Sequence, residues 1–86
     1  MFLLFGNWDI PSGGWYDFRG RYSDTLALVL DAEDYDYSHV VFEDEIIASY
    51  YESNGWWIGC YNDQCPASQG EVKELLDNVS GEMELI

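Results

Sequence analysis

Carboxylates are the side chains with which this sequence is best equipped to do chemistry. Seventeen Asp and Glu residues oppose three Lys and Arg residues, which gives the 86-residue chain a formal net charge of −14. Acid–base catalysis needs a carboxylate or histidine with a shifted pKa in a cleft. No spacing singles out a carboxylate pair, and the one histidine, His39, begins an apolar stretch typical of a buried strand. The serines lack the context of a nucleophile elbow. We therefore expect a structural role for His39 and no enzymatic activity.

Metal and disulfide sites have little support in the sequence. Residues 31–36 resemble a calcium loop but lack the glycine and the closing glutamate of an EF-hand. Cys60 and Cys65 are too few for a disulfide framework, and His39 does not complete a zinc site with them. We expect reduced thiols, with a bridge between the two cysteines as the alternative, and we expect no metal or other cofactor.

Charge itself is the remaining functional feature. A polyanionic chain repels nucleic acid and anionic membranes, so its expected partners are cationic. Carboxylates interleaved with exposed tyrosines can imitate DNA phosphates, which carry about one charge per 1.7 Å of duplex. Such a surface predicts binding to a basic, nucleic-acid-handling protein; the alternative is that acidity serves only solubility or adaptation to high salt. The predicted contact residues are Asp31, Glu33, Asp34, Tyr35, Asp36, Tyr37, Glu43, Asp44 and Glu45.

The first half of the chain must hold these residues on a sheet and a helix. An apolar and aromatic run predicts a strand over 2–8, and alternation predicts a second strand over 15–22 that pairs back on the first. We assign Trp15 and Phe18 to fold integrity. Ser23 or Asp24 is expected to cap a short helix that is apolar nearly all round and packs with little of itself exposed. Acidic residues at its C-terminal end oppose the helix dipole without an evident structural gain, which favours a functional role there.

The middle of the chain predicts an antiparallel meander of strands over 38–42, 46–51 and 56–61. The first turn falls within 43–45. The second contains Asn54-Gly55, a pair that suits a type I′ turn with both residues at positive φ.

The last part of the chain predicts a connection over 62–67 and then a helix. Ser68 and Glu71 match a capping box, apolar residues repeat with helical spacing over 72–79, and Gly81 stands where a C-cap is expected. The tail is expected to be frayed or to form an edge strand. The result is an α+β fold in one domain, β-β-α-β-β-β-α, with a core over 1–51, an extension over 52–86 and the helices on one face of a mostly antiparallel sheet.

No targeting segment is predicted. The apolar run at residues 1–5 is too short for a signal peptide, and no run approaches the roughly 20 apolar residues of a membrane span. We therefore expect a cytoplasmic protein.

The segment Gly-Gly-Trp-Tyr-Asp-Phe-Arg-Gly-Arg-Tyr at 13–22 carries a family resemblance. Together with the strand over 2–8 and His39-Val40-Val41, it resembles short bacteriophage proteins that have a GGW-x-D-F-x-G-x-F-like segment, a capped helix and a β-hairpin. The resemblance covers residues 2–51, although the helix here is richer in Leu and Val. It implies a phage or mobile-element origin and names no activity.

Small acidic phage proteins include anti-CRISPR and antirestriction DNA mimics, and this analogy of size and charge completes the functional hypothesis. We expect an inhibitor of host defence, monomeric or dimeric, that binds a Cas effector or restriction enzyme in the host cytoplasm. The alternative is a small structural or assembly module that acts through exposed aromatics such as Trp56 and Trp57.

Overall fold

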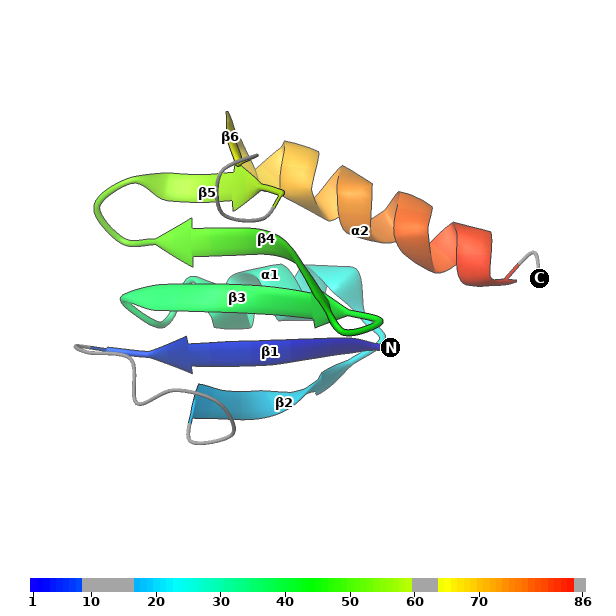
Figure 1. The fold of residues 1–86 in the computed structure, drawn as a ribbon, viewed down its shortest axis with the longest axis horizontal. Coiled ribbons are helices and arrows are strands. Elements are labelled where there is room, and N and C mark those ends of the chain that lie inside the picture. The colour runs from blue at the N-terminus through cyan, green and yellow to red at the C-terminus, as the bar shows by residue number, and fades with distance from the viewer. Residues whose placement is uncertain (9–16, 60–63, 85–86) are drawn as a thin grey trace.

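A computed structural model describes residues 1–8, 17–59 and 64–84, with side chains described as far as Ser80. Two helices lie on one face of a six-stranded sheet (Figure 1). The strands and helices are β1 (Phe2–Asn7), β2 (Phe18–Tyr22), α1 (Thr25–Ala32), β3 (Tyr37–Phe42), β4 (Glu45–Tyr51), β5 (Gly55–Ile58), β6 (Cys65–Ala67) and α2 (Gln69–Glu84). The predicted α+β class is confirmed.

The sheet has the strand order β2-β1-β3-β4-β5-β6, and each of these neighbouring pairs is antiparallel. β2 pairs back on β1, and β3, β4 and β5 form the meander, as predicted. β6 is an additional strand within the segment predicted to be a connection. It is short and lies at the edge of the sheet. Pro66 is tolerated there because an edge strand does not need every backbone amide to donate to a neighbouring strand.

The core lies between the sheet and the two helices. Alternation along the strands directs Phe2, Leu4, Val40, Ala48 and Trp56 toward the helices. From the helices, the core receives Leu28, Val29, Ala32, Val72 and Leu76. Residues beyond position 52 therefore supply part of the same core.

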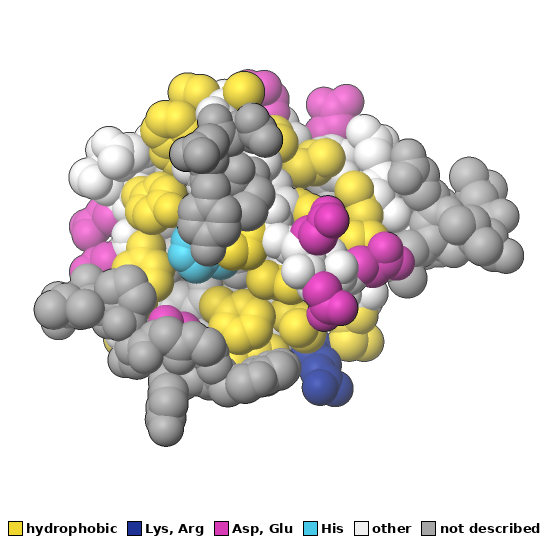
Figure 2. Space-filling model, viewed as in Figure 1, with side chains coloured by type: hydrophobic (Ala, Val, Ile, Leu, Met, Phe, Trp, Pro, Cys, Tyr) yellow, Lys and Arg dark blue, Asp and Glu magenta, His cyan; other side chains and the backbone are white. Residues whose placement is uncertain are grey.

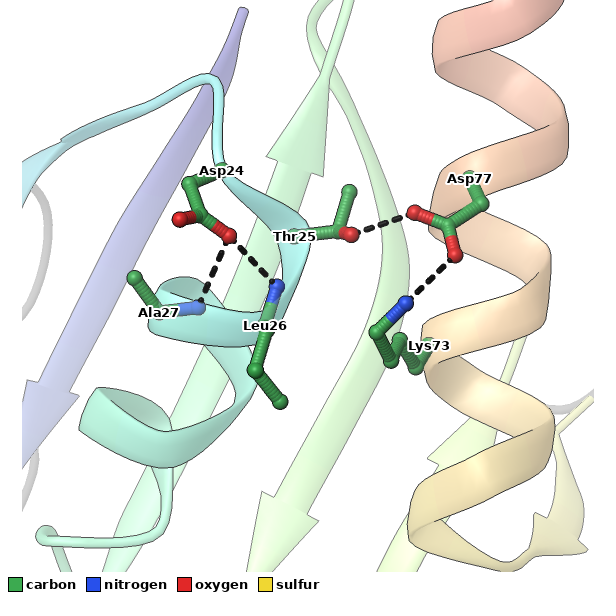
Figure 3. Close-up of polar contacts among 6 residues, drawn as sticks. All are labelled: Asp24, Thr25, Leu26, Ala27, Lys73 and Asp77. Carbon is green, nitrogen blue, oxygen red and sulfur yellow. Dashed lines mark hydrogen bonds and ion pairs between the residues drawn. The ribbon is translucent and has the colours of Figure 1, made fainter.

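Both helix starts follow the predicted capping chemistry. The Asp24 carboxylate accepts hydrogen bonds from the backbone amides of Leu26 and Ala27, at 3.0 and 3.2 Å (Figure 3). Ser68 and Glu71 form the predicted capping box, with the Glu71 amide 3.1 Å from the Ser68 Oγ and the Ser68 amide 3.2 Å from the Glu71 Oε1. These side chains satisfy backbone donors that have no partner within the helix.

Two expectations about the helices are wrong. α2 continues to Glu84, so Gly81 lies within the helix and is not its C-cap. One internal glycine costs only about 1 kcal/mol, which a continued helix tolerates. α1 buries Leu28 and Val29, but Leu26 and Leu30 are 49% and 50% exposed. A helix that packs on a single sheet buries only the side that faces the sheet.

A polar link joins the two helices (Figure 3). The Thr25 hydroxyl donates to the Asp77 carboxylate, which also receives the Lys73 ammonium at 2.7 Å. The hydrogen bonds from Lys73 and Thr25 hold the pKa of Asp77 below its ordinary value. Because Lys73 and Asp77 lie near solvent, this ion pair adds little stability. The link instead orients α2 against the start of α1.

The first hairpin turn lies within 43–45, as predicted, and the second differs from its predicted type. A two-residue loop of Glu43 and Asp44 joins β3 to β4, and both residues have positive φ, 50° and 67°, as in a type I′ turn. The β4–β5 loop has three residues, because Tyr51 pairs with Gly55. The Asn54 amide donates to the Tyr51 carbonyl and closes a turn, and Gly55, which follows it, is the one residue of this hairpin connection with positive φ, at 80°. The type I′ prediction for Asn54-Gly55 is therefore wrong, because the strand register decides the loop length.

Glu43→Asn combined with Asp44→Gly is expected to raise the free energy of unfolding by about 1 kcal/mol or more. Asn and Gly accept positive φ at low cost, whereas Glu and Asp in this region are strained. Urea unfolding of both chains at neutral pH measures the difference. A less stable double variant would show that the two acidic side chains make stabilising contacts that outweigh the backbone strain.

Candidate binding surface

The acidic residues at the end of α1 do not form one patch, because their side chains leave the helix on different flanks. The Tyr22 hydroxyl donates to the Asp31 carboxylate at 2.8 Å, on the β2 side. The Trp56 indole donates to the Glu33 carboxylate at 3.0 Å, and the Gln69 amide donates to it as well, on the β5 and α2 side. Burial and the Asp31 hydrogen bond raise the pKa of Tyr22 to about 12. Asp31 and Glu33 thus hold α1 to its neighbours.

Asp34 and Tyr35 occupy the connection from α1 to β3. The Asp34 side chain is exposed, and its carbonyl accepts a hydrogen bond from the Trp8 indole at 3.0 Å. The Tyr35 ring is half-buried, with its centroid 5.0 Å from that of Trp8. The Arg19 guanidinium lies 5.1 Å from each of these two rings. Tyr35 is therefore part of an intramolecular stack, which limits its availability to a partner.

Asp36 is joined by an acidic residue that sequence reasoning missed, Glu52. The Glu52 amide donates to the Asp36 carbonyl at 2.8 Å, which brings the two side chains together beyond the ends of β3 and β4. A hydrogen bond between the two carboxyl groups and their mutual repulsion raise the pKa of Glu52. No local sequence signal pairs residues 36 and 52; the pairing depends on the register of the hairpin.

Tyr37 was expected to be exposed, and that expectation is wrong. Its side chain is 8% exposed, and its hydroxyl lies 3.4 Å from the carboxylate of Asp17, which is itself buried. The Asn7 side-chain amide donates to the same carboxylate at 3.0 Å. Burial and the Asp17 charge raise the pKa of Tyr37. Alternation places Tyr37 on the sheet face away from the helices, where Asp17 covers it.

Glu43, Asp44 and Glu45 lie at the opposite end of β3 from Asp34 and Asp36. All three side chains are exposed. The five steps between the ends of β3, at about 3.3 Å each, place the two groups more than about 17 Å apart, because both groups lie beyond those ends. The predicted contact surface is thus divided in two. We call Asp34, Asp36 and Glu52 the helix-end acids, and Glu43, Asp44 and Glu45 the hairpin acids.

Most of the negative charge faces solvent. Of the thirteen acidic side chains that the structure describes, ten are exposed. Two of the three basic residues are engaged within the chain, because Arg19 donates to the Gly6 carbonyl at 2.7 Å and Lys73 pairs with Asp77. Intramolecular ion pairing therefore leaves most of the surface charge available to act on other molecules.

The sheet face away from both helices carries a second feature that sequence reasoning missed. We call it the open sheet face, and within the described residues no helix covers it (Figure 1). Figure 2 views this face and shows apolar side chains gathered around the histidine, with acidic side chains at both ends. Its half-buried members are Leu3, Phe5, Phe18, His39, Val41, Ile46, Tyr51 and Trp57.

Trp56 and Trp57 were both expected to be exposed, and for Trp56 that is wrong. Consecutive strand residues point to opposite faces, so Trp56 enters the core with 3% exposure while Trp57 lies half-buried on the open sheet face. The Trp56 ring packs against Tyr50 at 5.2 Å between centroids. Trp57 is opposite Ser49 on β4 and Pro66 on β6.

His39 lies in the middle of the open sheet face. Its Nδ1 is 2.9 Å from the Ser49 Oγ, and its ring lies between those of Tyr37 and Tyr51. Ser49 is fully buried, so this pair does not present a nucleophile to a substrate. Burial lowers the pKa of His39, and the Asp17 charge opposes that shift only in part. The setting agrees with the structural role predicted for His39.

The free energy of unfolding is expected to fall between about pH 7 and pH 5 because of His39. Its folded-state pKa is below the ordinary 6.5, so the neutral ring stabilises the fold above that pH, and the stabilisation is lost as the pH falls through the folded-state pKa. Urea unfolding across this range measures the slope. His39→Gln keeps a polar side chain without a titration and should flatten the curve; equal slopes would contradict the assignment.

The remaining sequence expectations concern cysteines, metals and Trp15. Cys65 is an exposed free thiol, while Cys60 and Trp15 lie outside the described residues. Within 1–8, 17–59 and 64–80, no group of three or more His, Cys, Asp or Glu side chains is arranged to hold a metal ion. Neither described helix combines the length and apolarity needed to cross a membrane.

Comparisons with known proteins found no relative of this chain. The chain matches no protein-family model, no curated protein sequence and no solved structure.

Proposed function

We propose that this chain is a non-enzymatic binding protein that occupies a basic, nucleic-acid-handling surface of another protein through its acidic ends. The supporting observation is that acidic residues stand where folding would favour other residues. Glu43 and Asp44 occupy positive-φ positions, and Asp36 and Glu52 form a carboxyl pair. Charge that opposes stability in two places is better explained by an interaction than by solubility alone.

The phage resemblance narrows the proposal to a target in host defence. A Cas effector or restriction enzyme presents Lys and Arg residues along its nucleic-acid groove, and a carboxylate surface competes with phosphates there. The helix-end acids and the hairpin acids lie beyond the two ends of β3, more than about 17 Å apart, and would contact separate parts of such a groove. The site of action would be the host cytoplasm, with no cofactor.

A pull-down from host lysate at about 50 mM and about 500 mM salt tests the proposal, because contacts between exposed charges weaken with ionic strength. We expect a nucleic-acid-handling protein that is retained only at low salt. Asp34→Lys with Asp36→Lys, or Glu43→Lys with Asp44→Lys, should weaken that binding at least tenfold. Glu74→Lys, a single charge reversal on the exposed side of α2, is the control for position and should have a small effect. An affinity that changes neither with salt nor with either pair of charge reversals would refute the proposal.

A small assembly module is the second candidate, and the open sheet face is the observation that favours it. Aromatic and aliphatic side chains on a face that no described helix covers can drive association. Self-association would bring together two chains of net charge −14, which opposes a homodimer at low salt. Sedimentation equilibrium at low and high salt separates the candidates: a dimer that strengthens with salt would support the assembly module.

A further inference from the structure

We infer that the outer side of α1, formed by Leu26, Ala27 and Leu30, binds an amphipathic helix of the partner. An apolar stripe on that helix would cover the two leucines, and Lys or Arg residues beside the stripe would meet the carboxylates around them. The inference rests on the proposed function, because it takes the partner to be basic. It adds the place of docking and the structural class of the docked segment.

The outer side of α1 is apolar and open to solvent. Leu28, Val29 and Ala32 are fully buried in the core, whereas about half of the surface of Leu26 and of Leu30 is exposed. These two leucines are four residues apart, so they lie on the same side of the helix with about 5–6 Å between their Cβ atoms. One exposed leucine is ordinary in a folded protein. Two on successive turns form a small apolar ridge.

α2 provides a comparison within the same molecule. Both helices lie on the same face of the sheet (Figure 1). α2 buries Val72 and Leu76 and exposes Glu71, Glu74 and Asn78, which is the usual division for a helix that packs on a sheet. The outer side of α1 has no such polar residue. A helix that is apolar nearly all round is normally covered on more than one side, so the composition of α1 fits a second cover that another molecule supplies.

Carboxylates border the apolar ridge on several sides. Asp34 is exposed at the end of α1, four residues beyond Leu30. Asp31 is exposed on the flank toward β2, where it accepts the hydrogen bond from Tyr22. On the flank toward α2, Asp77 accepts from Thr25, and Figure 3 shows Leu26 beside this link. Lys73 is the one basic residue in the sequence of the two helices, and it is paired with Asp77.

The shape of the ridge favours a helix as the occupant. Side chains spaced at i and i+4 pack into the groove of a second helix, with the two axes about 8–10 Å apart. The eight residues of α1 span about 12 Å at 1.5 Å per residue, so an apolar stripe of roughly two turns covers them. Lys and Arg lay their aliphatic stems along apolar surface while their charged ends reach outward. On both sides of such a stripe, those ends would reach Asp31 and Asp77.

Charge decides between a partner helix and a second copy of this chain. Two copies joined through α1 would bring the same carboxylates together, and each chain carries a net charge of −14. Basic residues beside the stripe of a partner helix meet these carboxylates with opposite charge. The apolar contact with two half-exposed leucines is small, so the affinity should depend on the stripe and on the flanking charges together.

Three synthetic peptides of about 15 residues test the inference. The first has a Leu stripe at helical spacing with Lys on both sides, the second has the same composition in scrambled order, and the third has Glu in place of Lys. We expect the first to bind the full chain at least tenfold more tightly than the other two, as measured by calorimetry at about 100 mM salt. Its contacts, mapped by amide chemical shifts, should centre on Leu26, Leu30 and Asp34.

Matched substitutions locate the binding without altering charge. Leu26→Gln with Leu30→Gln should weaken the first peptide at least tenfold, and Leu30→Gln alone is the milder variant. Both leucines are half exposed and Gln is a good helix former, so thermal unfolding should change little. Val41→Thr, on the open sheet face, is the control and should leave the affinity unchanged. A loss at Val41 equal to that of the leucine pair would overturn the inference.

The remaining outcomes separate this inference from the proposed function. Equal, salt-sensitive binding of the first and second peptides would overturn the docking site and leave a charge-led interaction intact. Equal binding of the first and third would show that the occupant need not be basic, which overturns the inference. A dimer that forms at high salt and is lost in the leucine double variant would assign the ridge to a second copy. If no peptide binds while the lysate experiment yields a salt-sensitive partner, the inference alone fails; if neither binds, both proposals fail.

Discussion

Trp56→Ala is expected to lower the free energy of unfolding by about 3–5 kcal/mol, the largest single-residue effect that we anticipate. The indole is nearly completely buried, packs on Tyr50 and donates to Glu33, so its removal leaves a cavity and an acceptor without its partner. Small domains have total stabilities of about 5–15 kcal/mol, and the variant should therefore be partly unfolded at 37 °C. Urea unfolding followed by circular dichroism measures the change.

Two further variants separate the causes. Trp56→Phe loses the donor to Glu33 but retains a ring that fills most of the space. It should therefore lower the free energy of unfolding less than Trp56→Ala does. Trp57→Ala makes the same truncation on the open sheet face, where the side chain is only half-buried, and should cost about 1–2 kcal/mol. Equal losses at positions 56 and 57 would contradict the assignment of the two tryptophans to opposite faces.

Gly6→Ala is the second large expected effect, with a loss of about 1–3 kcal/mol. A Cβ on Gly6 would lie 2.9 Å from the Ser38 Oγ and 2.9 Å from the Tyr35 Cγ. Ser38 has little room to move, because it is fully buried and donates to the Ala32 carbonyl at 2.7 Å. Tyr35 would have to shift away from Trp8. Thermal unfolding should show the loss, and near-ultraviolet circular dichroism should show a changed aromatic environment.

Gly70→Ala is the matched control for this change. Its Cβ would come no closer than 3.9 Å to Ser68, and the position lies at the exposed start of α2. Alanine is the better helix former, so stability should hold or rise by up to about 1 kcal/mol. If Gly6→Ala and Gly70→Ala lower the free energy of unfolding equally, close packing around Gly6 is not the cause of the loss.

Features with short-range causes could be predicted from this sequence. The Asp24 cap and the Ser68–Glu71 capping box depend on side chains within three residues of the amides they bind. The apolar and aromatic run over 2–8 and the apolar spacing over 72–79 likewise predicted β1 and α2. In these cases the local chemistry and the final fold favour the same structure.

Features decided by register could not be predicted. The pairing of Phe42 with Glu45 forces positive φ on Glu43 and Asp44, although Asn54-Gly55 has the better turn composition. A bulge in β4 contributes, since Val40 lies opposite Ala48 while Val41 lies opposite Ile46. Tertiary packing thus overrides local turn preference.

The candidate site was predicted only in part for the same reason. Sequence reasoning named the acidic residues but could not tell that β3 separates them into two groups, or that Glu52 joins Asp36. It also could not tell which strand face the helices would cover. Trp56 and Trp57 are adjacent in sequence, and only the position of α1 and α2 decides which of them is buried.

The strained turn at Glu43 and Asp44 has a consequence for folding kinetics. β3 and β4 pair residues close in sequence, whereas β1 pairs with β3 across 38 residues at Leu3 and Val41. Closing a short loop costs less entropy, so we expect the β3–β4 hairpin to be formed in the transition state for folding. The backbone strain then raises the barrier to folding and contributes little to the barrier to unfolding. Relieving about 1.4 kcal/mol of strain by Glu43→Asn with Asp44→Gly would speed folding about tenfold and leave the unfolding rate nearly constant.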